Sequence, residues 1–193
     1  MNSNQNYYQT EIYSTALNSE IKESNFEQVK FEKCNFQELS IIGCSFIDCM
    51  FNNSNLSLIT STKSSFLNCN FINCKIVRVN WHKIQGVLRV SLSFENFILN
   101  YSYFNGISFV KSEIYNCEVI ESDFASANLK KCGCRESNFL NTNFSYANLE
   151  QADFRGANNY FIDIFENKKN LKEAKFSRIE VENLLAPLQI DIE

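Results

Sequence analysis

The side chains best able to do chemistry in this sequence are its eight cysteines. In the stretch "CSFIDCMF", Cys44 and Cys49 lie five residues apart, and a phenylalanine follows two residues after each. Such pairs are compatible with a metal site, a disulfide framework or a redox pair, and also with free thiols in a tight core. His82 is the only histidine, which excludes a metal cage built from several histidines. Which of these interpretations holds depends on the structural elements that contain the cysteines, and the pattern of the surrounding residues indicates what those elements are.

Large apolar residues recur every five residues along most of the chain. Steps of five from Phe26 to Trp81 reach apolar residues at every position except Ser61, and steps of five from Phe94 to Phe154 reach only apolar residues. We call these positions the centres of the repeat units and predict that they form the core. They include fourteen phenylalanines: Phe26, Phe31, Phe36, Phe46, Phe51, Phe66, Phe71, Phe94, Phe104, Phe109, Phe124, Phe139, Phe144 and Phe154.

The period of five predicts a chain that bends once in each unit. Most residues two places before a centre are small, and alternate residues of an extended segment point the same way. A helix would instead repeat its apolar face at three and four residues. Four bends of about 90° close a coil of roughly twenty residues, and neighbouring coils stack at about 4.8 Å. Phe26, Phe46 and Phe66 then fall in one column, which indicates an all-β solenoid.

Units such as "SNF", "CNF", "SDF", "ANL" and "ADF" resemble those of the pentapeptide-repeat family. The resemblance covers about residues 21–159 and implies a right-handed quadrilateral β-helix. Two repeat blocks with an interruption between them and a short tail look like the layout of the quinolone-resistance (Qnr) and microcin B17 immunity (McbG) proteins. The handedness is an implication of the resemblance.

The repeat also answers the question that the cysteines raise. Seven of them occupy the small position two residues before a centre, and Cys134 is itself a centre. The five-residue spacing of Cys44 and Cys49 is therefore the period of the fold. We predict eight reduced, inward-facing thiols of low reactivity, with no metal and no cofactor.

Three segments are expected: an N-terminal cap at 1–20, the solenoid at 21–159 with a loop at about 82–93, and a C-terminal cap at 160–193. The tail contains a capping-box spacing from Ser177 to Glu180, and Pro187 should end a short helix at about 178–186. Its apolar residues predict either a cover over the open end of the solenoid or a homodimer contact, the use implied by the family resemblance. These residues are Ile179, Val181, Leu184, Leu185 and Leu188.

The interruption "WHKIQGVLRVSLSF" is either a loop that lets the coil restart or a protruding contact loop, as the resemblance to Qnr proteins implies. Six basic residues and one acidic residue lie between Lys63 and Lys111, whereas seven acidic and three basic residues lie between Glu113 and Asp153. The candidate contacts for a partner are Trp81, His82, Lys83, Arg89, Glu113, Glu118, Glu121 and Asp123.

The composition limits the classes of function. The net charge is −4, so a broadly basic nucleic-acid binder is not expected. There is no apolar run of membrane-spanning length, no export signal, no P-loop and no glycine fingerprint. We therefore expect a cytoplasmic, non-enzymatic solenoid that displays its outer faces to a protein partner. The alternative, implied by the resemblance, is a DNA-mimicking protein that binds DNA gyrase or another topoisomerase.

Overall fold

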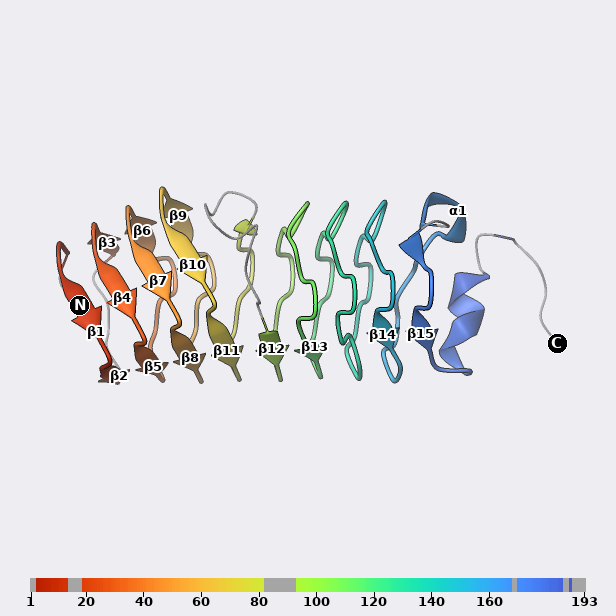
Figure 1. Cartoon of the computed structure of the whole chain (residues 1–193), viewed down its shortest axis with the longest axis horizontal. Coiled ribbons are helices and arrows are strands. Elements are labelled where there is room, and N and C mark those ends of the chain that lie inside the picture. Colours follow the sequence, from red (N-terminus) through yellow and green to blue (C-terminus); the bar gives the residue numbers. More distant parts are fainter. Residues whose placement is uncertain (1–2, 14–18, 82–92, 168–169, 186–187, 189–193) are drawn as a thin grey trace.

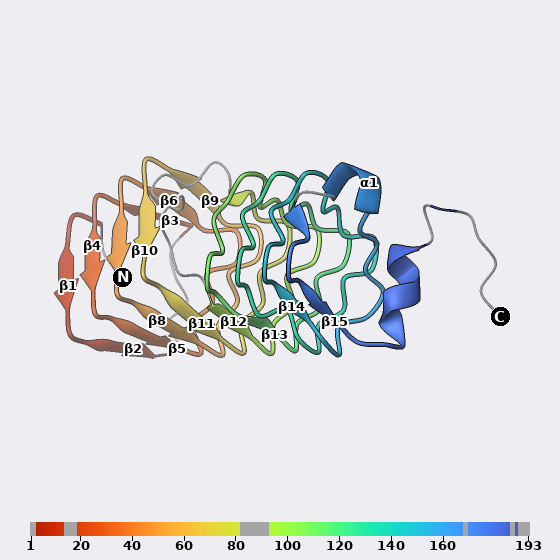
Figure 2. The same ribbon diagram turned by 45° about the vertical axis from the view of Figure 1, so that its right-hand side comes forward.

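A computed structural model describes residues 3–13, 19–81, 93–167, 170–185 and 188 of the chain. The chain winds into coils that stack along one axis, and every strand pair is parallel (Figures 1 and 2). Each coil has four short walls, which we number from the first to the fourth in chain order. The all-β solenoid predicted from the period of five is confirmed.

Three walls contain strands of two or three residues. The first wall contains β1 (Asn6–Tyr8), β4 (Asn25–Glu27), β7 (Ser45–Ile47) and β10 (Ser65–Leu67). The second wall contains β2 (Glu11–Tyr13), β5 (Lys30–Glu32), β8 (Met50–Asn52), β11 (Asn70–Ile72), β12 (Ser93–Glu95), β13 (Ile114–Tyr115), β14 (Asp153–Phe154) and β15 (Lys175–Phe176). The fourth wall contains β3 (Glu20–Lys22), β6 (Ser40–Ile42) and β9 (Thr60–Thr62). The third wall, like most of the later block, is joined by single bridges such as Asn35 to Asn55 and Ile98 to Glu118.

The register has the predicted interval of twenty residues. Phe26 pairs with Phe46, and Phe46 pairs with Phe66. Across the interruption, Phe71 pairs with Phe94, so this step is three residues longer. The segment 82–92, which contains most of the expected loop, lies outside the described residues.

The bend in each unit lies two residues after the centre, where the backbone is left-handed. Examples are Gln28 (φ 56°), Asn53 (φ 51°) and Gly106 (φ 68°). In the later block the turn is closed by a backbone hydrogen bond, as from the N–H of Ile107 to the carbonyl of Phe104 at 3.1 Å. A positive φ at the second turn residue together with this bond defines a type II turn.

All fourteen phenylalanine centres are at most 2% exposed. Within a column the rings stack, with centroids 4.6 Å apart for Phe26 and Phe46 and 4.5 Å apart for Phe46 and Phe66. Rings from neighbouring walls meet edge to face, as Phe31 and Phe36 do at 5.3 Å. Burial of each ring contributes roughly 1.5–3 kcal/mol of transfer free energy, so the aromatic columns are the main apolar core.

The solenoid begins earlier than expected. Residues assigned to an N-terminal cap form β1 and β2, which pair with β4 and β5. Tyr7 stacks on Phe26 at 4.9 Å, and Ile12 pairs with Phe31. The period of five does not predict this coil, because its register to the next coil is 19 residues and steps of five back from Phe26 do not reach Tyr7 or Ile12.

The solenoid also ends later than expected. β15 pairs with β14, and the ring of Phe176 stacks on that of Phe154 at 5.5 Å. A short helix, α1 (Ile164–Asn167), is inserted between β14 and β15, and the step between these strands is 22 residues. The expected boundary at 159 is therefore too early.

The expected C-terminal helix is a 3-10 helix, η4 (Glu180–Leu184), and the predicted capping box is wrong. The side chain of Ser177 does not cap η4, because its hydroxyl accepts a hydrogen bond from the N–H of Gly156 at 2.7 Å. The phenol of Tyr160 donates to the carbonyl of Glu180 at 3.0 Å, and Leu184 is buried in the core. These contacts hold η4 on the end of the solenoid.

Candidate interaction surface

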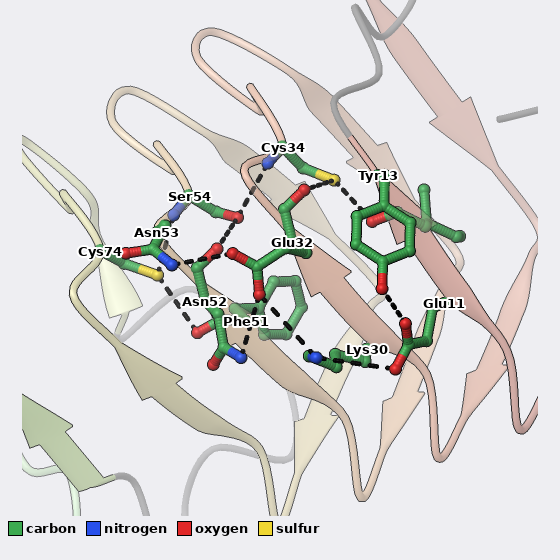
Figure 3. A network of polar contacts seen from close by, with 11 residues as sticks. Glu11, Tyr13, Lys30, Glu32, Cys34, Phe51, Asn52, Asn53, Ser54 and Cys74 are labelled. Atoms are coloured by element: carbon green, nitrogen blue, oxygen red, sulfur yellow. Dashed lines mark hydrogen bonds and ion pairs between the residues drawn. The ribbon is translucent and has the colours of Figure 1, made fainter.

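The small inward residues form a polar ladder between coils. In Figure 3 the thiol of Cys34 donates to the carbonyls of Ile12 at 3.3 Å and of Glu32 at 3.6 Å. The N–H of Cys34 donates to Ser54 Oγ at 3.0 Å, and the N–H of Ser54 donates to Cys74 Sγ at 3.3 Å. Cysteine and serine therefore play the same part, and the thiols are hydrogen-bonded as well as buried.

The same burial leaves the thiols unsuited to nucleophilic chemistry. All eight cysteines are free and buried. Burial raises the pKa of Cys74 and Cys117 to about 12 and raises the pKa of Cys69 and Cys134 well above the ordinary value. The pKa of Cys49 is lowered, chiefly by a hydrogen bond from the Cys69 thiol. No group of three or more His, Cys, Asp or Glu residues in the described part of the chain could hold a metal ion.

The residues available for contact with a partner are therefore the outward ones. Each repeat unit has three of them. The structure brings Glu118, Glu121 and Asp123 to the corner between the third and fourth walls and places Glu113 on the second wall. Glu118 accepts a hydrogen bond from Asn138 at 3.0 Å, and Glu113 lies 3.6 Å from Arg135. Glu118 and Glu121 therefore belong to the third wall and its corner, whereas Asp123 lies on the fourth wall, where it bridges to Tyr103.

Of the four candidates at the interruption, three lie outside the described residues: His82, Lys83 and Arg89. Trp81 is wrong as a surface contact, because its side chain is fully buried. Its ring packs 5.8 Å from Phe66, 5.9 Å from Phe71 and 6.2 Å from Phe104. Trp81 is a core centre of the fourth wall.

Acidic and basic side chains alternate on the described walls. On the second wall Lys30 lies 3.6 Å from Glu11 and 4.0 Å from Glu32, whose pKa is lowered mainly by a hydrogen bond from Asn53 (Figure 3). Further ion pairs join Lys130 to Glu150 at 2.7 Å and Arg155 to Asp153 at 2.6 Å. These pairs lie on the first and second walls, so neither of these two walls forms a continuous acidic surface over the described residues.

The third wall has exposed apolar side chains that the sequence analysis missed. Leu58, Ile98, Tyr101 and Leu140 are 37%, 40%, 40% and 42% exposed. They occupy three different outward columns of the wall that contains Phe36, Leu56, Ile76 and Leu99, so the interval of twenty does not single them out in the sequence. On this wall Ile98 and Tyr101 are flanked by Lys75 and Arg78 on one side and by Glu118 and Glu121 on the other.

The C-terminal candidates divide into two groups. Leu184 is buried in the solenoid end and Leu185 is partly buried. Ile179 is 84% exposed, Val181 is 38% exposed and Leu188 is 40% exposed. Leu184 thus covers the end of the core, while the other three remain on the surface.

Comparison with known proteins identifies the repeat. A family model for pentapeptide repeats matches eight copies within residues 19–57 and 122–158. Both repeat blocks of the chain therefore contain pentapeptide repeats. A comparison with curated protein sequences finds no significant match.

Solved pentapeptide-repeat structures have the same fold. A trypsin-treated variant of QnrB1, a plasmid-mediated fluoroquinolone resistance protein, matches with a TM-score of 0.64 and 18% sequence identity over 100% of this chain and 99% of that chain. Full-length QnrB1 matches with a TM-score of 0.61 and 18% identity over 97% of this chain and 99% of that one. Within the described ranges, no helix of this pentapeptide-repeat solenoid is both long and apolar enough to cross a membrane.

Proposed function

We propose that this solenoid is a non-enzymatic interaction module that presents its outer walls to a protein partner. The observation that carries the proposal is the third wall, where apolar and charged side chains are exposed on a backbone fixed by ring stacks and by the Ser/Cys ladder. A rigid scaffold of this kind holds the backbone of its surface in place before binding. The entropy lost when the surface is ordered on binding is therefore small, which favours specific contacts.

Partner capture by wall variants tests this proposal. A third-wall variant carries Lys75→Ser, Ile98→Ser and Tyr101→Ser, and a matched first-wall variant carries Lys111→Ser, Lys131→Ser and Gln151→Ser. We expect a protein captured by the wild type to be lost with the first set and retained with the second. Capture that neither set changes, with both variants folded by circular dichroism, would argue against the walls as the binding surface.

DNA gyrase is the second candidate partner. It is supported by the likeness to QnrB1 over nearly the whole length of both chains. The layout of two repeat blocks with an interruption, which resembles that of Qnr proteins, supports it as well. The alternating charges of the described walls do not favour imitation of DNA by an acidic face. Recognition of gyrase would instead depend on the shape of the rod and on local contacts, including the acidic corner at Glu118 and Glu121.

A supercoiling assay with purified gyrase, with and without a fluoroquinolone, tests the gyrase hypothesis. We expect micromolar protein to inhibit gyrase or to protect it from the drug, and we expect deletion of residues 82–92 to weaken the effect. A Glu118→Gln/Glu121→Gln variant measures the part played by the acidic corner. If the wild type has no effect in either reaction, gyrase is not the partner, whereas the wall-variant experiment still tests the broader proposal.

A further inference from the structure

The third wall carries an ordered pattern of charge over three successive coils. Lys75 bridges to Ile98, and Ile98 bridges to Glu118, so these residues form one outward column. The residues three places later, Arg78, Tyr101 and Glu121, occupy the left-handed corner positions of the same units, with φ of 57°, 59° and 50°. In both columns the order along the rod is basic, apolar, acidic.

The charges of this pattern are available to a partner. Lys75, Arg78, Glu118 and Glu121 are all exposed, and none of the four forms an ion pair with another described residue. The guanidinium of Arg78 lies over the ring of Tyr101 at 5.5 Å, which fixes its direction along the wall. The acidic carboxylate of Glu118 is held in place by Asn138.

We propose that the third wall binds a second copy of this chain, with the two rods antiparallel. The two-fold axis lies in the interface, perpendicular to the rods, and passes through the coil that contains Ile98 and Tyr101. Rotation about this axis reverses the order of the coils and places each column opposite the same column of the other copy. Lys75 then faces Glu118 of the other copy, and Arg78 faces Glu121 of the other copy. The axis brings Ile98 against Ile98 and Tyr101 against Tyr101. Such an isologous contact needs a self-complementary surface, and this wall provides one.

The remaining column of the wall agrees with the same axis. Val77, Asn100 and Ile120 follow the three buried centres on successive coils, and all three are partly exposed. The axis places Val77 opposite Ile120 of the other copy and Asn100 opposite Asn100. The amide oxygen of Asn100 already accepts the N–H of Ile120 at 2.8 Å, which leaves its NH₂ group to cross the interface. All three columns therefore match under one operation.

The charge order argues for a copy of this chain in antiparallel orientation. In a parallel pair the two-fold axis would run along the rod and bring Lys75 against Arg78 and Glu118 against Glu121 of the other copy, and like charges in an interface are unfavourable. The surface is also distinct from the C-terminal end, where η4 covers the core. The strip from Asn55 to Asn138 spans about 19 Å at the usual spacing of strands, which is small for an interface. We expect a dissociation constant on the order of 10–100 µM.

Charge reversal across the axis gives a decisive test. Sedimentation equilibrium of the wild type should show a monomer–dimer equilibrium in this range. Arg78→Glu alone and Glu121→Arg alone should each weaken self-association at least about tenfold, because each creates two like-charge contacts. An equimolar mixture of the two variants should associate within about threefold of the wild type, since both contacts regain opposite charges. Lys131→Glu, at the equivalent corner position of the first wall, should leave association unchanged.

Each outcome decides the proposal once circular dichroism shows that the variants are folded. A wild type that remains monomeric at several hundred micromolar overturns it. A dimer that persists in both single variants shows that another surface, such as the C-terminal end, is used. Two weakened variants that fail to associate in the mixture exclude the antiparallel pairing of Arg78 with Glu121.

Discussion

At the residue scale, serine and cysteine recur at the inward position two places before many of the centres, where they make hydrogen bonds to the backbone. Ser137 Oγ donates to the carbonyl of Ile114 at 2.8 Å and accepts the N–H of Cys117 at 3.0 Å. The thiol of Cys117 in turn donates to the carbonyls of Phe94 at 3.6 Å and Tyr115 at 3.2 Å. A serine or cysteine at this position fits beside the phenylalanine columns and can pair with backbone groups of the adjacent coil, as buried polar groups nearly always do.

Substitution of Cys74 separates its hydrogen bonds from its volume. Its sulfur accepts the N–H of Ser54 and donates to the carbonyls of Phe51 and Ile72, each at 3.3 Å. Cys74→Ser keeps a donor and an acceptor and should change the free energy of unfolding by less than about 1 kcal/mol. Cys74→Ala leaves a buried N–H without a partner and should cost roughly 1–3 kcal/mol. Urea unfolding of the two variants measures the difference, and equal stability would mean that the ladder contributes little.

The raised thiol pKa values predict loss of stability in mild alkali. Burial raises the pKa of Cys74 and Cys117 to about 12, whereas an unfolded thiol ionises near pH 8.5. The folded state keeps both protons, so their contribution is intact below about pH 8.5 and is lost as the pH rises toward 12. Between pH 7.5 and 9.5, each thiol should lower the free energy of unfolding by about 1 kcal/mol.

Urea unfolding at the two pH values, in the presence of a reductant, measures this effect. A Cys74→Ser/Cys117→Ser variant has no thiol to ionise at these positions, so its stability should fall by about 2 kcal/mol less than that of the wild type. An equal fall in both proteins would mean that these two thiols do not carry the pH dependence.

At the scale of the element, the corner of each unit is the costly part of the fold. Left-handed backbone is disfavoured for residues with a Cβ, yet Arg78, Tyr101 and Glu121 adopt it, as do residues at most other corners. The corner residue lies between two buried residues, the centre of its own unit and the small inward residue of the next unit. Because both neighbours are held in the core, the corner residue has to adopt the left-handed conformation. Burial of the centres thus compensates for strain at the corners.

Two opposite substitutions measure this strain. Gly106 has φ 68°, and an added Cβ would meet no atom within 4 Å, so Gly106→Ala tests the backbone alone and should cost about 1 kcal/mol. Tyr146 has φ 58° and is 63% exposed, so Tyr146→Gly should stabilise the protein by about 0.5 kcal/mol. Denaturant midpoints should move in opposite directions. Movement in the same direction would show that side-chain contacts, and not backbone conformation, decide these positions.

The sequence predicts the repeated elements well because one residue type marks each unit. Phe26 to Phe154 show the period directly, and the structure buries every phenylalanine centre in that range. The end coils could not be found in this way, because offsets of 19 and 22 residues move Tyr7, Ile12 and Phe176 out of phase. The surface residues are harder to predict from the sequence than the repeated elements. Trp81 was assigned both to the core and to the contact loop, and only the structure shows that its side chain is fully buried. The third-wall pattern depends on outward residues that the core does not constrain.

At the scale of the whole molecule, the fold is a stack in which each coil contacts its neighbours. Phe124, for example, lies between Phe104 at 4.7 Å and Phe144 at 5.7 Å, and its N–H donates to Asn143. Stability of such a stack is approximately a sum over coils and over the contacts between adjacent coils. The departures from twenty residues occur only at the end coils and at the interruption. Within a block, an insertion or deletion should therefore be tolerated only if it preserves the twenty-residue register between coils.

Removal of one complete coil tests this constraint. Asp123 bridges to Asn143, so deletion of residues 124–143 joins Asp123 to Phe144 and places Phe144 on Phe104 in the position that Phe124 leaves. We expect a folded protein with unchanged circular dichroism and a maximum dimension about 4.8 Å shorter in small-angle X-ray scattering. Deletion of residues 124–141 removes less of the chain but moves Phe144 from a centre to an outward corner. This control should unfold at lower denaturant concentration because every later centre is out of phase with the coil beneath it. If the control were as stable as the complete-coil deletion, the register of the stack would not be what determines the fold.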